Sequence, residues 1–260
     1  MSETTIYRWH GGELIPLDYC DMTDTRIEVA DSWFVADGRV LGLELHRSRF
    51  LGSMRADIRE AADADAFWVA AMQLVPREGD WFPRVELQAR TGSHLLVLRV
   101  RSAPDRTTNL AVATWPDGDP RAVPDIKGPD LDTMIRIRTT IQARGAAEAV
   151  ITTHDGFVVE TSQSGLLWWR GEILCGPPAE FARVDSVTVR SLLTLATALG
   201  IETYEEAVTP SELAETELWS MNALHGIRIV TSWIDGPPLA QRPGRLALWR
   251  ARMDALRRPF

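Results

Sequence analysis

The chain has 260 residues, of which 45% are hydrophobic and 25% charged, and its formal net charge is −8. This composition is typical of a globular protein and excludes a disordered, collagen-like or coiled-coil chain. The negative charge gives no electrostatic support for binding nucleic acid or an anionic membrane, and no apolar run reaches the roughly 18 residues that a membrane span needs.

The first hundred residues alternate short apolar runs with turns, which predicts a small α/β domain over residues 1–102. Asp37-Gly38 is typical of a hairpin turn. An alanine-rich stretch with apolar residues at helical spacing predicts a helix over residues 60–74. The predicted strands cover residues 29–35, 39–45, 84–89 and 94–101.

A proline-rich segment, residues 103–128, is predicted to connect two domains. It contains one short predicted strand, residues 110–114, and ends near Lys127, the only lysine beside 27 arginines. Arginine serves in most surface roles of lysine, but only lysine has the primary amine that forms a Schiff base with a carbonyl. Lys127 is therefore a candidate catalytic residue, although a preference for arginine could also spare one lysine by chance.

Residues 129–260 predict a larger α/β domain. Two hairpins are indicated, at His154-Asp155-Gly156 and at Arg170-Gly171, and Thr209-Pro210-Ser211-Glu212 forms a capping box that predicts a short helix. The predicted helices cover residues 130–144, 186–199 and 245–257. The predicted strands cover residues 149–152, 157–160, 166–169, 172–175, 218–221 and 227–233.

An ordered set of motifs lies between residues 126 and 160: Ile-Lys-Gly, a helix ending in glycine, Glu-Ala-Val, an Asp-Gly hairpin and a glutamate 33 positions after the lysine. Further motifs follow at 186–188, 198–202 and 222–224. Together they resemble the class IV aminotransferases, the fold-type IV pyridoxal-phosphate enzymes, well over residues 125–235 and only thinly before. The resemblance implies an α/β (α+β) fold of two domains with the cofactor in the interdomain cleft, and a homodimer.

The resemblance also implies which residues would bind pyridoxal 5'-phosphate. Lys127 would form the Schiff base and shuttle a proton, and Glu160 would hold the ring nitrogen in its protonated form. Arg49 would bind the phosphate group; considered alone, Arg49 and Glu160 would be ordinary surface residues. The other residues placed at the phosphate are Ser186, Val187, Thr188 and Ala223.

Four residues are candidates for binding the substrate. Arg101 and Arg106 resemble an arginine loop of the lyase branch of the family, where either could bind a carboxylate, and a surface role is equally expected. Ser32 and Asn222 are the other two.

The sequence departs from the family pattern at three places. The Gly-Asp-Gly-x-Phe-Glu motif is missing at residues 26–32, Leu131 replaces a tyrosine, and Gly165 replaces an asparagine. These departures concern the type of reaction more than the binding of the cofactor.

The expected function is amino-group transfer between an amino acid and a 2-oxo acid. The alternatives are a 4-amino-4-deoxychorismate lyase, which releases pyruvate and 4-aminobenzoate, and a non-catalytic binding protein of the same fold. We expect no metal, nucleic-acid or membrane partner. Two distant cysteines, Cys20 and Cys175, and the lack of a signal-peptide pattern predict a cytoplasmic location.

Overall fold

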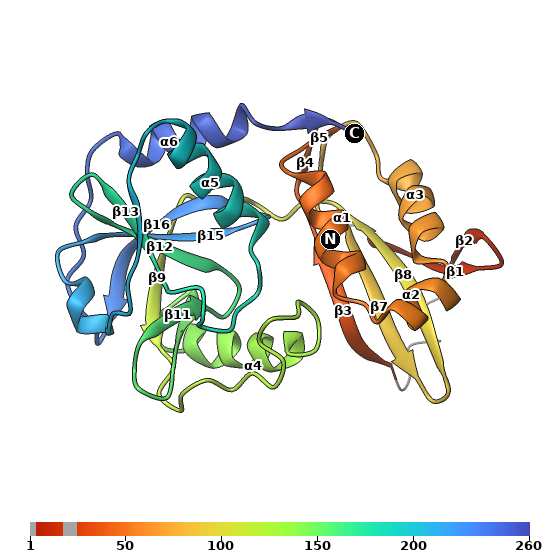
Figure 1. The fold of residues 1–260 in the computed structure, drawn as a ribbon, viewed down its shortest axis with the longest axis horizontal. Coiled ribbons are helices and arrows are strands. Elements are labelled where there is room, and N and C mark those ends of the chain that lie inside the picture. Colours follow the sequence, from red (N-terminus) through yellow and green to blue (C-terminus); the bar gives the residue numbers. More distant parts are fainter. Residues whose placement is uncertain (1–3, 18–24) are drawn as a thin grey trace. The chain divides into compact units, whose positions relative to one another are not determined.

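The computed structural model describes residues 4–17 and 25–260, and Cys20 lies outside these ranges. The described chain folds as two compact units, each built from discontinuous segments (Figure 1). The first unit comprises the chain up to Asp105, Ile126–Pro129 and Leu256–Phe260. The second comprises Arg106–Asp125 and Asp130–Ala255. The segment that contains Lys127 therefore belongs to the first unit.

The first unit is built on an antiparallel sheet with the strand order β2-β1-β8-β7-β3 (Figure 1). Its strands are β1 Thr4–His10, β2 Glu13–Pro16, β3 Arg26–Ser32, β7 Arg84–Arg90 and β8 Ser93–Arg101. Because side chains alternate along a strand, Val85 and Leu87 enter the core while Arg84 and Glu86 lie on the opposite face.

Helices cover the apolar face of this sheet, and Phe50 and Phe67 from two of them pack in its core. The helices are α1 Leu43–Gly52, α2 Ala56–Ala61 and α3 Ala64–Leu74. A small second sheet has the order β17-β5-β4-β6. Its strands are β4 Val35–Ala36, β5 Arg39–Val40, β6 Asp80–Trp81 and β17 Arg258–Pro259.

Three predicted elements of the first unit are wrong in part. The strand predicted over 29–35 is divided between β3, which ends at Ser32, and β4, which begins at Val35. The strand predicted over 39–45 ends at Val40, because Gly42, with φ of 63°, turns the chain into α1. The helix predicted over 60–74 is divided between α2 and α3, because Asp63, with φ of 51°, interrupts the helical path. The hairpin at Asp37-Gly38 is confirmed, since it joins β4 to β5.

The second unit is built on a mixed sheet with the order β11-β10-β9-β16-β15-β12-β13-β14. An additional pairing joins β11 to β12 at Glu160 and Gly165, so the strands from β11 to β12 close into a ring. The strands are β9 Asn109–Thr114, β10 Glu148–Thr152, β11 Val158–Thr161, β12 Gly165–Arg170, β13 Ile173–Gly176, β14 Thr203–Glu205, β15 Glu217–Asn222 and β16 Gly226–Ile234.

Helices surround this ring, with α4 on the opposite side from α5 and α6 (Figure 1). The helices are α4 Leu131–Gln142, α5 Val187–Ala198, the short 3₁₀ helix η2 Pro210–Leu213 and α6 Arg245–Asp254. The predicted capping box and both predicted hairpins of this unit are confirmed. The strand predicted in the connection is also confirmed as β9, which pairs with β10 and β16.

Within the ranges 4–17 and 25–260, no helix combines the length and apolar character needed to cross a membrane. Cys175 is a buried free thiol on β13, and burial raises its pKa to about 11.

Candidate active site

Lys127 is fixed to the exposed edge of β3. The amide of Ala30 donates a hydrogen bond of 2.6 Å to the carbonyl of Lys127, so the chain at 126–129 runs beside this strand. Gly128 makes the close approach possible: it has φ of 149°, and a Cβ there would lie 2.9 Å from the Cα of Val29. Only glycine therefore fits at position 128, directly after Lys127.

A buried polar cluster lies on the helix side of β3. The carboxylate of Asp31 is fully buried and accepts hydrogen bonds from Nε and Nη2 of Arg49, both at 2.8 Å. Nδ1 of His46 lies 2.7 Å from the same carboxylate. Lys127 lies near enough for its charge to act on His46. The candidate Schiff-base lysine and the candidate phosphate arginine thus belong to one region of the first unit.

Burial and the neighbouring charges determine the charge states of Asp31 and His46. Burial alone would raise the pKa of Asp31, but His46 and Arg49 outweigh it and hold that pKa at about 2. Burial lowers the pKa of His46, Asp31 opposes this effect, and the positive charges of Arg49 and Lys127 add to it. At neutral pH, His46 is therefore uncharged and donates its Nδ1 proton to Asp31, which leaves Arg49 as the counter-ion.

Asp31, which holds the candidate residue Arg49, is not among the residues that the sequence predicts for the site. Its signal was available: an aspartate stands between Val29 and Trp33 on the apolar side of a strand. A carboxylate at such a position requires a cationic partner.

Glu160 lies at the point where β11 pairs with β12, and its side chain forms a close ion pair with Arg121. Arg121 also donates from Nε and Nη2 to Asp119, at 2.8 and 2.7 Å, and from Nη2 to the carbonyl of Ala182 at 3.0 Å. Burial would lower the pKa of Arg121, but Asp119 and Glu160 together raise it. Arg121 is therefore a fixed cation that pairs with Glu160 and orients it, and the sequence did not identify this arginine.

The start of α5 packs directly against the strand that pairs with Glu160. A Cβ on Gly165 would lie 2.7 Å from Cγ2 of Val189 and 3.7 Å from Cβ of Ser186. A side chain at position 165 would therefore displace Val189 in the first turn of the helix.

The helix start itself has the features of an anion site. Ser186 is the N-cap, and its hydroxyl accepts a hydrogen bond from the amide of Val189. Val187 and Thr188 occupy the first turn and are buried. Unpaired amides and the helix dipole at such a terminus favour a phosphate group.

The turn that joins β15 to β16 is tied to the same end of the ring. The side chain of Asn222 donates to the hydroxyl of Ser164 at 3.0 Å and accepts from the amide of His225 at 2.8 Å. Asn222 therefore shapes the turn that contains Ala223. The structure brings Ala223, Asn222 and Glu160 together at one end of the second unit, because Gly165 pairs with both Met221 and Glu160.

Two arginines, Arg106 and Arg250, donate hydrogen bonds to the main chain of this turn. Nη2 of Arg106 and Nη1 of Arg250 donate to the carbonyl of His225, at 3.3 and 2.9 Å, and Nδ1 of His225 accepts from the amide of Thr107 at 3.1 Å. Burial and then the surrounding arginines lower the pKa of His225 to about 4, so it is neutral at pH 7. The side chain of Arg106 thus contacts the turn of the second unit.

A buried ion pair joins Glu148 of β10 to Arg228 of β16 at this end of the ring. Arg228 also donates to the hydroxyls of Ser164 and Ser220, at 3.0 and 3.3 Å, and Thr161, next to Glu160, donates to Glu148. The Glu-Ala-Val motif at 148–150 therefore has a structural role, since its glutamate anchors the turn beside Glu160.

Ser32 and Arg101 lie in the first unit. Ser32 pairs across the sheet with Arg84. Arg101 donates from Nε to the carbonyl of Phe82 at 2.7 Å, and its guanidinium lies 4.7 Å from the centre of the Phe82 ring.

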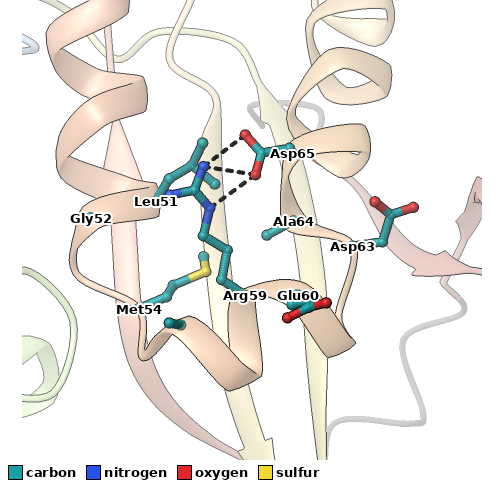
Figure 2. A pocket seen from close by; sticks show the side chains of 9 residues that line it. Leu51, Gly52, Met54, Arg59, Glu60, Asp63, Ala64 and Asp65 are labelled. Atoms are coloured by element: carbon teal, nitrogen blue, oxygen red, sulfur yellow. Dashed lines mark hydrogen bonds and ion pairs between the residues drawn. The ribbon is translucent and has the colours of Figure 1, made fainter.

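A pocket of about 520 Å³ lies in the first unit beside the α1–α2 and α2–α3 turns (Figure 2). Arg59 donates there to Asp65 from Nε and Nη2, both at 2.9 Å. The lining residues are Leu51, Gly52, Met54, Ala56, Arg59, Glu60, Asp63, Ala64 and Asp65. None of them is a residue that the sequence predicts for the active site.

Comparison with known proteins gives a consistent family and fold. The family described as amino-transferase class IV matches residues 28–233. No curated protein sequence matches the chain at a significant level.

Among solved structures, a hypothetical aminotransferase from Mycobacterium tuberculosis is 18% identical, with 98% of each chain covered and a TM-score of 0.78. A fold IV-transaminase from Curtobacterium pusillum is 19% identical, with 97% of this chain and 96% of that chain covered and a TM-score of 0.74. A branched-chain aminotransferase from Thermoproteus uzoniensis is 17% identical, with coverages of 97% and 93% and a TM-score of 0.77. The fold is therefore that of the fold-type IV aminotransferases, and since the family match spans most of its length, the chain belongs to the class IV aminotransferase family.

Proposed function

We propose that this protein is a pyridoxal-phosphate-dependent aminotransferase that transfers an amino group between an amino acid and a 2-oxo acid. The observation that carries the proposal is the position of the only lysine: Lys127 is fixed beside β3 by a main-chain hydrogen bond, in the same region as Arg49. A related structure of the Mycobacterium tuberculosis protein has α-ketoglutarate and pyridoxamine phosphate bound.

The donor set of the chain fits this cofactor. Lys127 supplies the amine for its aldehyde, the α5 start supplies amides for its phosphate, and Glu160 supplies a carboxylate for its ring nitrogen. Arg121 pairs with that carboxylate and with Asp119, so the three side chains together carry a net charge of −1, which suits a cationic ring nitrogen. Asp31 orients Arg49 for the phosphate.

In the proposed mechanism, pyridoxal phosphate supplies the electron sink for the bond broken at the substrate Cα. Lys127 would hold the cofactor through its amine, and the same amine, once free, would take the proton that leaves the substrate Cα onto Nζ. Glu160 keeps the ring-nitrogen proton in place throughout. Arg49, Ser186, Val187, Thr188 and Ala223 bind the phosphate.

We also propose the remaining assignments of this site. Arg101, Arg106, Ser32 and Asn222 bind the substrate, the protein works as a homodimer, and its location is cytoplasmic. Arg106 and Asn222 would act at the 222–226 turn, which both of them contact or shape.

The alternative reaction is that of an aminodeoxychorismate lyase. Two residues favour it: Leu131 replaces the tyrosine of many aminotransferases, and Asn222-Ala223-Leu224 resembles the lyase motif. Lys127 and Glu160 would serve both reactions, so they do not distinguish them.

The test is a set of L- and D-amino acids added singly to the cofactor-loaded protein, followed by aminodeoxychorismate. Conversion of the cofactor to the pyridoxamine form by an amino acid, without 4-aminobenzoate release, is expected. Release of 4-aminobenzoate with no such conversion would replace the aminotransferase by the lyase. Bound cofactor with neither reaction would favour a non-catalytic binding protein.

A further inference from the structure

The segment that contains Lys127 is held at its tip by the first unit. Residues 126–129 belong to that unit, whereas the chain on both sides of them belongs to the second. The carbonyl of Lys127 accepts a hydrogen bond of 2.6 Å from the amide of Ala30, and the side chain of Ile126 packs against the apolar core of the first unit. These contacts fix the backbone at Lys127, but the course of the chain on either side depends on other residues.

Asp130 closes the base of this segment. Its Oδ1 accepts a hydrogen bond from the amide of Ala122 at 3.0 Å, and its Oδ2 accepts one from the amide of Val123 at 2.9 Å. Hydrogen bonds from amides to a carboxylate are among the stronger ones in proteins. One side chain thereby joins the two ends of a loop, residues 122–130, and Lys127 lies between these ends.

Asp130 does not use its side chain in the way that its position at helix α4 favours. It is the N-cap residue of α4, where an aspartate normally accepts a hydrogen bond from an amide two or three residues further on. Here the side chain makes no capping hydrogen bond, and the backbone, with φ of −92° and ψ of 5°, lies outside the extended region that an N-cap residue usually adopts. The helix therefore begins without a side-chain cap, while both carboxylate oxygens bind the loop.

Helix α4 gives this loop a rigid base. The side chains of Met134, Ile137 and Ile141 belong to a buried apolar cluster of the second unit. The amide of Met134 also donates to the carbonyl of Asp130 at 2.9 Å, which ties Asp130 to the first turn of the helix. The loop that carries Lys127 is thus fixed at its tip and at its base by elements that are themselves packed in a core.

We propose that Asp130 is a positioning residue for Lys127, because it holds the loop in the conformation that presents the lysine amine to the aldehyde of pyridoxal phosphate. The inference rests on the proposed aminotransferase function and adds a residue to it. A loop that is closed before the cofactor arrives has already lost much of its conformational freedom, so less is lost when the amine condenses with the aldehyde and releases water. The competing explanation is that Asp130 only stabilises the fold around the start of α4.

Two forms of the cofactor separate these explanations. The groups proposed for the phosphate and the ring nitrogen, namely Arg49, the α5 start and Glu160, serve both pyridoxal phosphate and pyridoxamine phosphate. Only pyridoxal phosphate has the aldehyde that reacts with Lys127. Displacement of the lysine therefore weakens the binding of pyridoxal phosphate alone, whereas a general loss of structure weakens the binding of both forms.

The first test measures the dissociation constant of each form with the cofactor-free protein by calorimetry. Asp130→Ala removes both acceptors, and we expect it to weaken the binding of pyridoxal phosphate about tenfold, while that of pyridoxamine phosphate changes less than about twofold. Asp130→Asn retains one acceptor oxygen and places an NH₂ group against an amide donor, so we expect it to weaken the binding of pyridoxal phosphate about threefold. This second variant provides the result if Asp130→Ala does not fold.

Asp37→Asn is the matched control for Asp130→Asn. Oδ1 of Asp37 accepts a hydrogen bond of 2.9 Å from the amide of Gly79, which is likewise distant in the sequence, and neither residue is assigned to the site. This variant is expected to bind both forms of the cofactor as the wild type does.

The second test needs no cofactor. Amide hydrogen exchange, resolved by mass spectrometry of overlapping peptides, is compared between the wild type and Asp130→Ala. The amides of Ala122 and Val123 are expected to exchange about tenfold faster or more in the variant, while those of α4 beyond its first turn exchange as before.

The outcomes distinguish a failure of this inference from a failure of the proposed function. Equal losses of affinity for both forms, or pyridoxal phosphate bound as tightly by Asp130→Ala as by the wild type, would overturn the inference and leave the aminotransferase in place. Faster exchange along the whole of α4 would also contradict it, since that result assigns Asp130 a purely structural role. A wild type that binds neither form of the cofactor would overturn the proposed function and the inference with it.

Discussion

Asp31 determines the position of Arg49, because it binds two of its donors from a fully buried carboxylate. An aspartate that remains ionised without exposure to water depends on its cationic partner, and the partner depends on it for orientation. The phosphate role proposed for Arg49 is therefore a property of the pair.

We expect Asp31→Asn to lower the free energy of unfolding and to remove part of its pH dependence. The pKa of Asp31 falls from 3.8 to about 2 on folding. The carboxylate therefore contributes about 2 kcal/mol above pH 4, and this contribution is lost as the pH falls through 2. Urea unfolding followed by tryptophan fluorescence between pH 2 and 7 measures the effect.

The control is Asp57→Asn, which changes an exposed carboxylate paired with Arg55 and is expected to leave the unfolding midpoint nearly unchanged. Equal pH dependence in wild type and Asp31→Asn would show that the buried pair is not ionised as described.

Glu160→Gln should retain the cofactor, since Lys127, Arg49 and the α5 start are intact, but turnover should fall by about two orders of magnitude or more. A neutral amide cannot hold the ring nitrogen as a cation. Bound cofactor is measured by its visible absorbance and turnover by amino-group transfer. Glu172→Gln, on an exposed turn glutamate, is the matched control. Unchanged turnover in Glu160→Gln would remove this glutamate from the mechanism.

At the scale of secondary structure, close backbone contacts position the site as much as the helices do. The chain at Lys127 adds to the edge of β3, and Gly128 permits this contact. The α5 start approaches Gly165 through the side chains of Val189 and Ser186. Both contacts require a residue without a side chain.

Gly128→Ala should lower the free energy of unfolding by roughly 1–3 kcal/mol and displace Lys127, because the new Cβ meets the backbone of Val29, which cannot move alone. Gly52→Ala, in open space at the end of α1, should be neutral or slightly stabilising. Urea midpoints measure the change in stability, and the visible absorbance of bound cofactor measures the displacement of Lys127. Equal behaviour of both variants would show that the edge contact is unimportant.

The sequence predicted correctly those elements that a few neighbouring residues specify. The Asp-Gly and Arg-Gly hairpins and the capping box at 209–212 were found because their turn residues act within a few positions. Helix α1 was missed, because Gly42 redirects the chain after a short strand and its helical face has weak apolar spacing. The division of residues 60–74 at Asp63 depends on one left-handed residue, which apolar spacing does not reveal.

At the scale of the whole molecule, the chain crosses between its units more than once. Residues 126–129 return to the first unit between two stretches of the second, and residues 256–260 return again to pair β17 with β5. Sequence order alone suggests one connection, because such returns are fixed by pairings between distant residues. The ordered motifs around Lys127 and Glu160 were readable because their spacing lies within one segment. Arg121, the partner of Glu160, was not readable, because that contact joins residues that are distant in the sequence.

The central claim is that Lys127 is the attachment point of pyridoxal phosphate, and borohydride reduction tests it directly. The reduced, digested protein is analysed by mass spectrometry, with Lys127→Ala as the control. The account predicts a single cofactor adduct on the peptide that contains Lys127, absent from the variant, since the chain has no other lysine. A colourless protein that takes up no added cofactor, or a wild type without the adduct, would contradict it.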